Sequence, residues 1–184
     1  MPKIPDMDLR MAEVVRRALS AINKNKYAVG GAMALRGHGI VRETRDLDVF
    51  LLEDARYAIF DSLRKEGFKI FAINEPIHFW AVLPKFRRYL PDYRVDLLIT
   101  VISVEMDAIE NPVISKIIGK NAFIFPATEL AASKFISGRP QDLQDLIRMV
   151  NFGLVEFGKV KRAIQSVTED DAIEFQRWWS ETFC

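Results

Sequence analysis

The first third of the chain changes repeatedly between helical and extended spacing of its apolar residues. Residues 8–24 repeat apolar positions at helical intervals, and Asp8 is suited to cap that helix. A short apolar strand, 27–29, then enters the pair Gly30-Gly31, and a short helix is expected over 32–36. The pattern predicts a helix, a strand, a tight glycine turn and a second helix.

A strand with strictly alternating polar and apolar residues is expected next. Residues 46–51 alternate polar and apolar side chains, which is typical of a strand with one buried face, and a helix is expected from about 53 to 66. Three further β-rich runs are separated by turn-forming and basic segments: 68–73, 77–83 and 93–100. These runs predict a mostly antiparallel or mixed sheet.

Helical patterns dominate from Pro126 onward. Glycine or threonine breaks separate four expected helices: 128–137, 140–152, 155–167 and 169–182. The fold class is therefore α+β, with a mixed, twisted sheet flanked by helices. Residues 1–126 are expected to form the α/β core, and residues 127–184 a small helical region packed on it.

Composition narrows the class of protein only slightly. With 184 residues and 49% apolar side chains, the chain can bury a real core. Its 26 basic and 25 acidic side chains nearly cancel, so a nucleic-acid partner would need a local basic surface. The one cysteine, Cys184, excludes a disulfide framework, and no apolar stretch could span a bilayer. A cytoplasmic protein without a membrane partner is expected.

The chemistry is carried by a few acidic residues. Asp46 and Asp48 are two positions apart on a strand, so their carboxylates project from one face and can bind a hard divalent cation. Asp96 lies in an otherwise apolar strand, where an isolated carboxylate is costly unless it is paired or coordinates a metal. Directly after a strand, Gly30 and Gly31 would let the backbone approach a phosphate closely.

Together these residues resemble the nucleotidyltransferase superfamily, whose pattern is a glycine pair after a strand, an Asp-x-Asp on the next strand and a later Asp on a neighbouring strand. More narrowly, the segments RETRDLD and ELAASKFISGRPQDLQDL look like those of AbiEii-type and related bacterial or archaeal nucleotidyltransferases. The resemblance covers roughly residues 27–150. It implies the minimal nucleotidyltransferase fold of DNA polymerase β-like proteins.

The resemblance also implies roles for particular residues. Asp46, Asp48 and Asp96 would hold two Mg²⁺ ions, which Mn²⁺ could replace, and Gly30-Gly31 would bind the phosphates of an NTP such as ATP. Lys134 is a candidate for the triphosphate, although a lysine on an apolar helix can also snorkel to the surface. The candidates for positioning near the metals are Arg42, Thr44 and Arg45.

Other polar and aromatic features have more ordinary interpretations. Arg139, Asp142 and Asp145 are spaced for helix capping and one-turn ion pairs. His38 and His78 have no second histidine at ligand spacing and are expected to be structural. The pair Trp178-Trp179 is expected to pack on the core, with a possible oligomer contact.

The basic segment PKFRRYLPDYR, residues 84–94, interleaves arginines with aromatic rings. Such a segment could hold RNA through phosphate contacts and stacking, although it could equally be a solvated loop.

Two hypotheses follow. The first is an enzyme that moves NMP from an NTP to a hydroxyl, with an RNA or tRNA end favoured over a protein or small-molecule acceptor. It could belong to a toxin–antitoxin pair and so have an antitoxin partner. The second is a catalytically silent module that keeps the same fold for binding or regulation.

Overall fold

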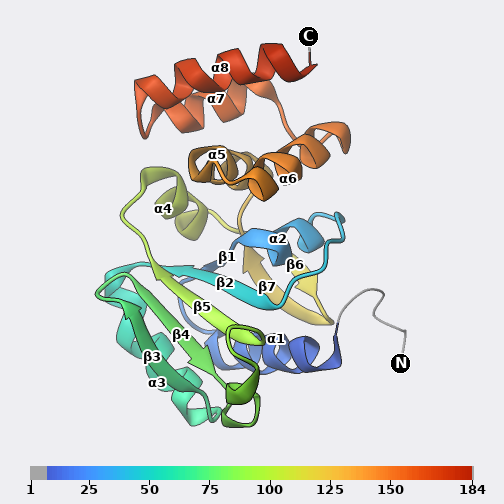
Figure 1. The fold of residues 1–184 in the computed structure, drawn as a ribbon. Coiled ribbons are helices and arrows are strands. Elements are labelled where there is room, and N and C mark those ends of the chain that lie inside the picture. The colour runs from blue at the N-terminus through green and yellow to red at the C-terminus, as the bar shows by residue number, and fades with distance from the viewer. Residues whose placement is uncertain (1–7, 184) are drawn as a thin grey trace.

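A computed structural model describes residues 8–183 of the chain. Its centre is a seven-stranded mixed sheet with the strand order β3-β4-β5-β2-β1-β7-β6 (Figure 1). The strands are β1 (Ala28–Val29), β2 (Asp46–Leu51), β3 (Lys69–Asn74), β4 (His78–Val82), β5 (Arg94–Ile99), β6 (Val113–Ile117) and β7 (Lys120–Ile124). Strand β2 is parallel to β5 and antiparallel to β1, so the predicted mixed sheet is confirmed.

One face of the sheet is buried against the N-terminal helices. Helix α1 (Leu9–Ile22) begins at Asp8, whose side chain accepts a hydrogen bond from the Arg10 backbone N–H at 2.7 Å, as predicted. Helix α3 (Arg56–Lys65), which follows the 3-10 turn η1 (Glu53–Ala55), packs beside α1. The alternate residues of β2 that point into this core are all fully buried: Leu47, Val49 and Leu51.

The opposite face carries the polar positions. Helix α2 (Gly31–Gly37) starts directly after β1, and the 3-10 turn η2 (Pro84–Tyr89) joins β4 to β5. Because side chains alternate along a strand, the burial of Leu47 and Val49 turns Asp46 and Asp48 to this second face. The site described below is built there.

The C-terminal third consists of four helices among the described residues. Helices α5 and α6 lie over the sheet, and α7 and α8 form a second tier above them (Figure 1). Their bounds are α5 (Ala127–Ser137), α6 (Pro140–Asn151), α7 (Phe157–Gln165) and α8 (Glu169–Phe183). Trp178 and Trp179 pack against Phe175 and other rings, which confirms the packing interpretation of the tryptophan pair.

Three elements were not predicted from the sequence. Helix α4 (Ser103–Glu110) is a single short helix, and β6 and β7 form a hairpin at the edge of the sheet. In β6, Val113 is 43% exposed and Ile114 is 65% exposed, so the strand lacks the alternation that marks a half-buried strand. Among residues 8–183, none of the helices is both long and apolar enough to cross a membrane.

Candidate active site

The parallel pairing of β2 with β5 brings the three predicted carboxylates together. Asp48 is paired with Asp96 across the two strands, and Asp46 is paired with Arg94 two residues earlier on each strand. Each carboxylate offers an oxygen that lies within 4.8 Å of those of the other two. Paired residues share a face of the sheet, so the strand register itself creates this cluster.

The electrostatics of the cluster favour a cation. Burial, followed by the charges of Asp46 and Asp96, raises the pKa of Asp48 to about 7, although Arg139 and Lys134 oppose the shift. Asp96 is 3% exposed, and its Oδ2 makes no hydrogen bond to any described residue, although Arg94 Nε lies 2.8 Å away. Three carboxylates with an unsatisfied oxygen among them form a donor set for a hard divalent ion.

The glycine pair is required by the close approach of the β1–α2 turn to these carboxylates. The Gly30 backbone N–H donates to the Asp48 carbonyl at 3.0 Å. Gly31 has a φ of +53°, and a Cβ at this position would lie 1.8 Å from Asp48 Oδ2. At Gly30 a Cβ would lie 2.5 Å from Phe50 Cε2. No larger residue fits here unless the surroundings move.

Two clefts meet at the carboxylates. The first, of about 220 Å³, lies between the sheet and α5, and the second, of about 810 Å³, opens toward the loop before β2. Five residues line both: Gly31, Asp46, Asp48, Arg139 and Asp142. The first cleft also contains His78, Arg94, Asp96, Ser133 and Lys134. Asp46 and Asp48 are therefore reachable from both clefts, whereas Asp96 lines only the first.

Solved structures share this architecture. The antibiotic-resistance factor ANT(2″)-Ia aligns over 96% of this chain and 95% of its own, with a TM-score of 0.57 and 13% identity. A nucleotidyltransferase-like protein from Paracoccidioides brasiliensis aligns over 94% and 90%, with a TM-score of 0.53 and 16% identity. The chain has the nucleotidyltransferase fold.

A third solved structure with this nucleotidyltransferase fold is the lincosamide antibiotic adenylyltransferase LnuA in its lincomycin-bound form. It aligns over 77% of this chain and 95% of its own, with a TM-score of 0.50 and 14% identity. No family model and no curated protein matches the sequence. The fold prediction is thus confirmed, while the narrower likeness to AbiEii-type proteins stays a prediction from the motifs.

Within the nucleotidyltransferase fold, the loop before β2 places its three predicted residues differently. Thr44 Oγ1 donates to Asp46 Oδ1 at 2.6 Å and so holds one carboxylate of the cluster. Arg42 turns toward α6, where its Nε lies 3.3 Å from Asp145 Oδ2. Arg45 is paired with Asp92 at 2.8 Å. All three line the second cleft, but only Thr44 touches a carboxylate of the cluster.

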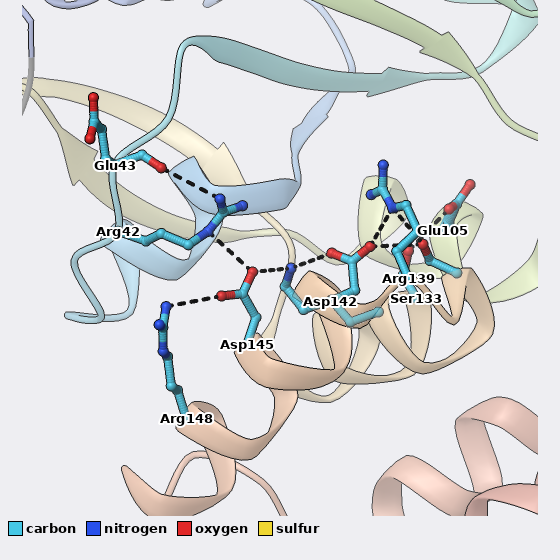
Figure 2. Close-up of polar contacts among 10 residues, drawn as sticks. Arg42, Glu43, Glu105, Ser133, Arg139, Asp142, Asp145 and Arg148 are labelled. Carbon is cyan, nitrogen blue, oxygen red and sulfur yellow. Dashed lines mark hydrogen bonds and ion pairs between the residues drawn. The ribbon is translucent and has the colours of Figure 1, made fainter.

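Lys134 is not a surface lysine. It is 4% exposed, and its Nζ donates to Asp142 Oδ1 at 2.9 Å and to Asp145 Oδ2 at 2.8 Å (Figure 2). The two aspartates come from α6, so the side chain joins α5 to α6. The snorkelling interpretation of Lys134 is therefore wrong, because the next helix supplies two buried carboxylates. Its predicted contact with a triphosphate stays a prediction.

Arg139 and Arg148 also form ion pairs with the two aspartates that bind Lys134. Arg139 Nε donates to Asp142 Oδ2 at 2.6 Å, which confirms the expected one-turn pair, and Arg148 Nη1 lies 3.4 Å from Asp145 Oδ1. Burial alone would raise the pKa of Asp142, but the hydrogen bond and charge of Lys134, with bonds from Ser137 and Arg139, outweigh it and lower that pKa. Figure 2 shows the chain of contacts running from the loop before β2 to α5 and α6.

Glu105 of α4 stabilises the wall of the first cleft through two hydrogen bonds. It accepts a hydrogen bond from Ser133 Oγ at 3.1 Å (Figure 2) and another from Thr100 Oγ1. Burial raises the pKa of its carboxyl group, although both hydrogen bonds oppose the shift. Because Ser133 lines the first cleft, this contact ties α4 to the part of α5 that faces the carboxylates.

Two cleft residues were missed or interpreted differently from the sequence. His78 Nε2 lies 2.7 Å from Asp96 Oδ1, while the other predicted structural histidine, His38, contacts the Phe125 carbonyl at 2.8 Å. Arg94 Nη2 donates to Asp46 Oδ2 at 3.4 Å. The position of Arg94, two residues before Asp96 on one strand, could have indicated a shared face, whereas His78 becomes a neighbour only through the pairing of β4 with β5.

Proposed function

We propose that this protein transfers a nucleoside monophosphate from an NTP to a hydroxyl group of an acceptor. The acceptor oxygen forms a bond to the α-phosphorus, the bond from that phosphorus to the bridging oxygen breaks, and pyrophosphate leaves while the hydroxyl proton passes to water. The observation that carries the proposal is the convergence of Asp46, Asp48 and Asp96 beside the Gly31 turn, at the junction of two clefts.

The donor set fits magnesium. All three ligands are carboxylates, as Mg²⁺ prefers, and Asp96 Oδ2 accepts no hydrogen bond from any described residue, although it forms an ion pair with Arg94. Asp46 and Asp48 would hold two ions, Asp96 would share the one on the acceptor side, and Mn²⁺ could substitute. When bound, the metal would neutralise phosphate charge and make the acceptor hydroxyl easier to deprotonate.

The other residues of the site would bind and orient the substrates. Gly31 lets the β1–α2 turn lie directly against Asp48, where its backbone would approach the phosphates, and Thr44 holds Asp46 in place through its hydrogen bond. Lys134 and Arg139 bring positive charge to the first cleft and are suited to the triphosphate. Such a reaction needs little covalent participation by the protein, because positioning and charge neutralisation supply much of the rate.

The acceptor is proposed to be an RNA or tRNA end, with protein and small-molecule hydroxyls as the alternatives. ANT(2″)-Ia is an antibiotic-resistance factor and LnuA is a lincosamide antibiotic adenylyltransferase, so antibiotics belong among the acceptors to be tested. The AbiEii-like motifs support a test for a toxin role and for an antitoxin partner.

Incubation with each α-labelled NTP and Mg²⁺, in the presence of total RNA, lysate protein or antibiotics, tests the proposal. We expect one class of acceptor to be labelled by the wild type but not by Asp46→Asn/Asp48→Asn. The matched control is Asp54→Asn/Asp61→Asn, which removes two exposed carboxylates near α3.

A melting experiment separates the enzyme from a catalytically silent module. Mg²⁺ with the correct NTP at about 100 times its dissociation constant should stabilise the protein by about 2.7 kcal/mol. This gain corresponds to a rise in Tm of roughly 5 to 10 °C for a domain of this size. Absence of both labelling and stabilisation with every NTP would contradict the enzyme and favour the silent module.

A further inference from the structure

The metal face of the sheet continues beyond the carboxylates. The strand register aligns four residues in one row across β2, β5, β4 and β3: Asp48, Asp96, Trp80 and Phe71. Paired residues point to the same face, and adjacent strands are about 4.8 Å apart. Trp80 therefore lies one strand from Asp96, and Phe71 lies one strand further.

A second row of paired residues lies beside the first and changes from acidic at β2 to basic at β3. It runs from Asp46 through Arg94 and Val82 to Lys69. The β2 end of the face is thus acidic, whereas the β3 end is cationic and aromatic. A gradient of this kind separates a place for metal ions from a place for a negatively charged ligand.

Arginines lie over both rings. The Arg94 guanidinium carbon is 4.8 Å from the centre of the Trp80 ring, and that of Arg87, in η2, is 5.5 Å from the centre of the Phe71 ring. Arg87 belongs to the basic segment 84–94, so the fold carries part of that segment to the row that begins at Asp48. Lys85 of the same segment is engaged elsewhere, since it donates to Glu13 at 2.7 Å.

The two rings are not part of the main core. Phe79 and Ala81, which flank Trp80 on β4, are buried among core residues, so Trp80 points to the other side. Phe71 and Trp80 are both partly exposed, and Ile73, two residues after Phe71, is 45% exposed. Helices α5 to α8 lie away from β3 and β4 (Figure 1).

We infer that Phe71, Trp80, Arg87 and Arg94, hereafter the stacking surface, bind the 3′-terminal nucleotides of a single-stranded RNA acceptor. Unpaired bases stack on aromatic rings and on guanidinium planes, while arginines contact the phosphates. The terminal hydroxyl would then lie beside Asp96. This inference rests on the proposed function and deepens it by assigning the acceptor and its binding surface.

Charge argues for RNA over the antibiotic alternative where the antibiotic is a polyamine. A polycation would meet Arg87 and Lys69 at the β3 end of the face and would be repelled, whereas a polyanion would be attracted. The rings add a second selection, because they favour flat bases over the puckered rings of sugars.

Direct observation of Trp80 provides the first test. The chain has three tryptophans, so the variant Trp178→Phe/Trp179→Phe leaves Trp80 as the only one. A short single-stranded RNA with a free 3′ hydroxyl and a 5′ fluorophore is titrated without NTP. Trp80 emission should be quenched over the same concentrations at which the RNA anisotropy rises. A rise in anisotropy without quenching, or no binding up to about 100-fold above a micromolar dissociation constant, overturns the inference.

Substitutions test the surface in the unaltered background. Trp80→Ala and Phe71→Ala should each weaken RNA binding about 5- to 150-fold, the range known for loss of one stacked base, while Trp80→Phe should retain most of the affinity. Circular dichroism establishes that each variant is folded. The matched control is Tyr57→Ala, which removes a ring that is 67% exposed on α3 and should leave binding unchanged.

Arg87 of η2 can be tested through the salt dependence of RNA binding. Arg87→Ala should weaken binding and also reduce the slope of log affinity against log salt by about 0.7, as expected for one lost phosphate contact to a single strand. Arg64→Ala, an exposed arginine on α3 near the Phe60 ring, is the matched control. Equal salt slopes for wild type and Arg87→Ala would contradict a phosphate contact.

The experiments distinguish a wrong proposed function from a wrong assignment of the stacking surface. If no NTP stabilises the protein and no acceptor is labelled, the proposed function is wrong. If RNA is labelled equally by the wild type and by Phe71→Ala/Arg87→Ala, or if an antibiotic is labelled in its place, only the stacking surface is wrong. In the Trp178→Phe/Trp179→Phe background, Asp46→Asn/Asp48→Asn should still bind RNA with quenching of Trp80, because Trp80, Phe71 and Arg87 are unchanged.

Discussion

Two groups of aspartates differ in the cations around them. Asp46, Asp48 and Asp96 line the first cleft, whereas of Asp142 and Asp145 only Asp142 does, because Asp145 is fully buried. Asp142 and Asp145 are met by Lys134, Arg139, Arg42 and Arg148, which are distributed over three segments of the chain (Figure 2). Every carboxylate oxygen of this group has a cation within 3.4 Å. The group is electrically satisfied, and it joins α5, α6 and the loop before β2.

The other group is short of cations. Arg94 contacts Asp46 and Asp96 but not Asp48, and the pKa of Asp48 is raised to about 7 by burial and by the two neighbouring carboxylates. Carboxylates in a protein therefore become a candidate metal centre through a local excess of negative charge, not through number alone. The contrast predicts opposite responses to substitution in the two groups.

The largest effect is expected at the centre of the cation-poor group. Asp48→Asn should lower the rate of NMP transfer by about 10²- to 10⁴-fold, because a metal contributes several kcal/mol of transition-state stabilisation. Without Mg²⁺, the same variant should melt at a higher temperature than wild type, since it removes a poorly tolerated charge. Rate and Tm are measured together with Asp54→Asn, and a lower Tm for Asp48→Asn would remove the basis of the comparison.

The cation-rich group should respond in the opposite direction. Asp145→Ala leaves Lys134 and Arg42 with less compensation and should destabilise the fold by about 3 to 5 kcal/mol in urea unfolding. Asp61→Ala breaks an exposed pair with Arg64 and should cost less than about 1 kcal/mol. Equal costs for the two variants would mean that burial of the network contributes nothing to stability.

A glycine tests how tightly the cation-poor group is enclosed. Gly31→Ala combines a positive φ with a clash against Asp48, whereas Gly119→Ala has a φ of +77° and no atom within 4 Å of the added Cβ. The strain alone should cost about 1 to 2 kcal/mol in both variants. Gly31→Ala should cost more than this in urea unfolding and should also lose activity. Similar unfolding energies for the two variants would show that Asp48 moves aside easily.

The smallest effect is a difference in pH dependence. The folded-state pKa of Asp48, about 7, is above the 3.8 of an unperturbed aspartate, so without Mg²⁺ its contribution to stability is full below pH 3.8 and is lost as the pH rises toward 7. The Tm advantage of Asp48→Asn over wild type should therefore be largest at about pH 8 and vanish near pH 4.

Asp142 has its pKa lowered, so its contribution is present above 3.8 and is lost as the pH falls through its folded-state pKa. Asp142→Asn should be less stable than wild type at neutral pH, and the deficit should shrink in acid. Parallel Tm profiles for the Asp48 and Asp142 variants would contradict the assigned difference.

The sequence predicted elements better than it predicted contacts between them. Alternation at residues 46–51 and helical spacing at residues 8–24 predicted β2 and α1, because each element buries one face. The β6–β7 hairpin was missed, since an edge strand with exposed Val113 and Ile114 has no such pattern. Strand β1 was detectable mainly through the glycines that follow its two residues.

In the candidate site, too, single residues were predictable from the sequence but contacts between elements were not. The aspartates could be chosen because an acidic pair on a strand and an isolated Asp96 are conspicuous among apolar residues. The partners of Lys134 could not, because they depend on how α5 and α6 pack, and the row from Asp48 to Phe71 depends on strand register. Residues whose role comes from an inter-element contact need the fold before they can be recognised.

The shared register has an evolutionary consequence. A shift of β4 by one residue would turn Trp80 into the core and Phe79 and Ala81 out to solvent, which the core would resist. Descendants of this chain can thus exchange the side chains at positions 71 and 80, and with them the chemistry of the neighbouring ligand, by single mutations. The spacing between that ligand and Asp96 is inherited unchanged with the hydrophobic core.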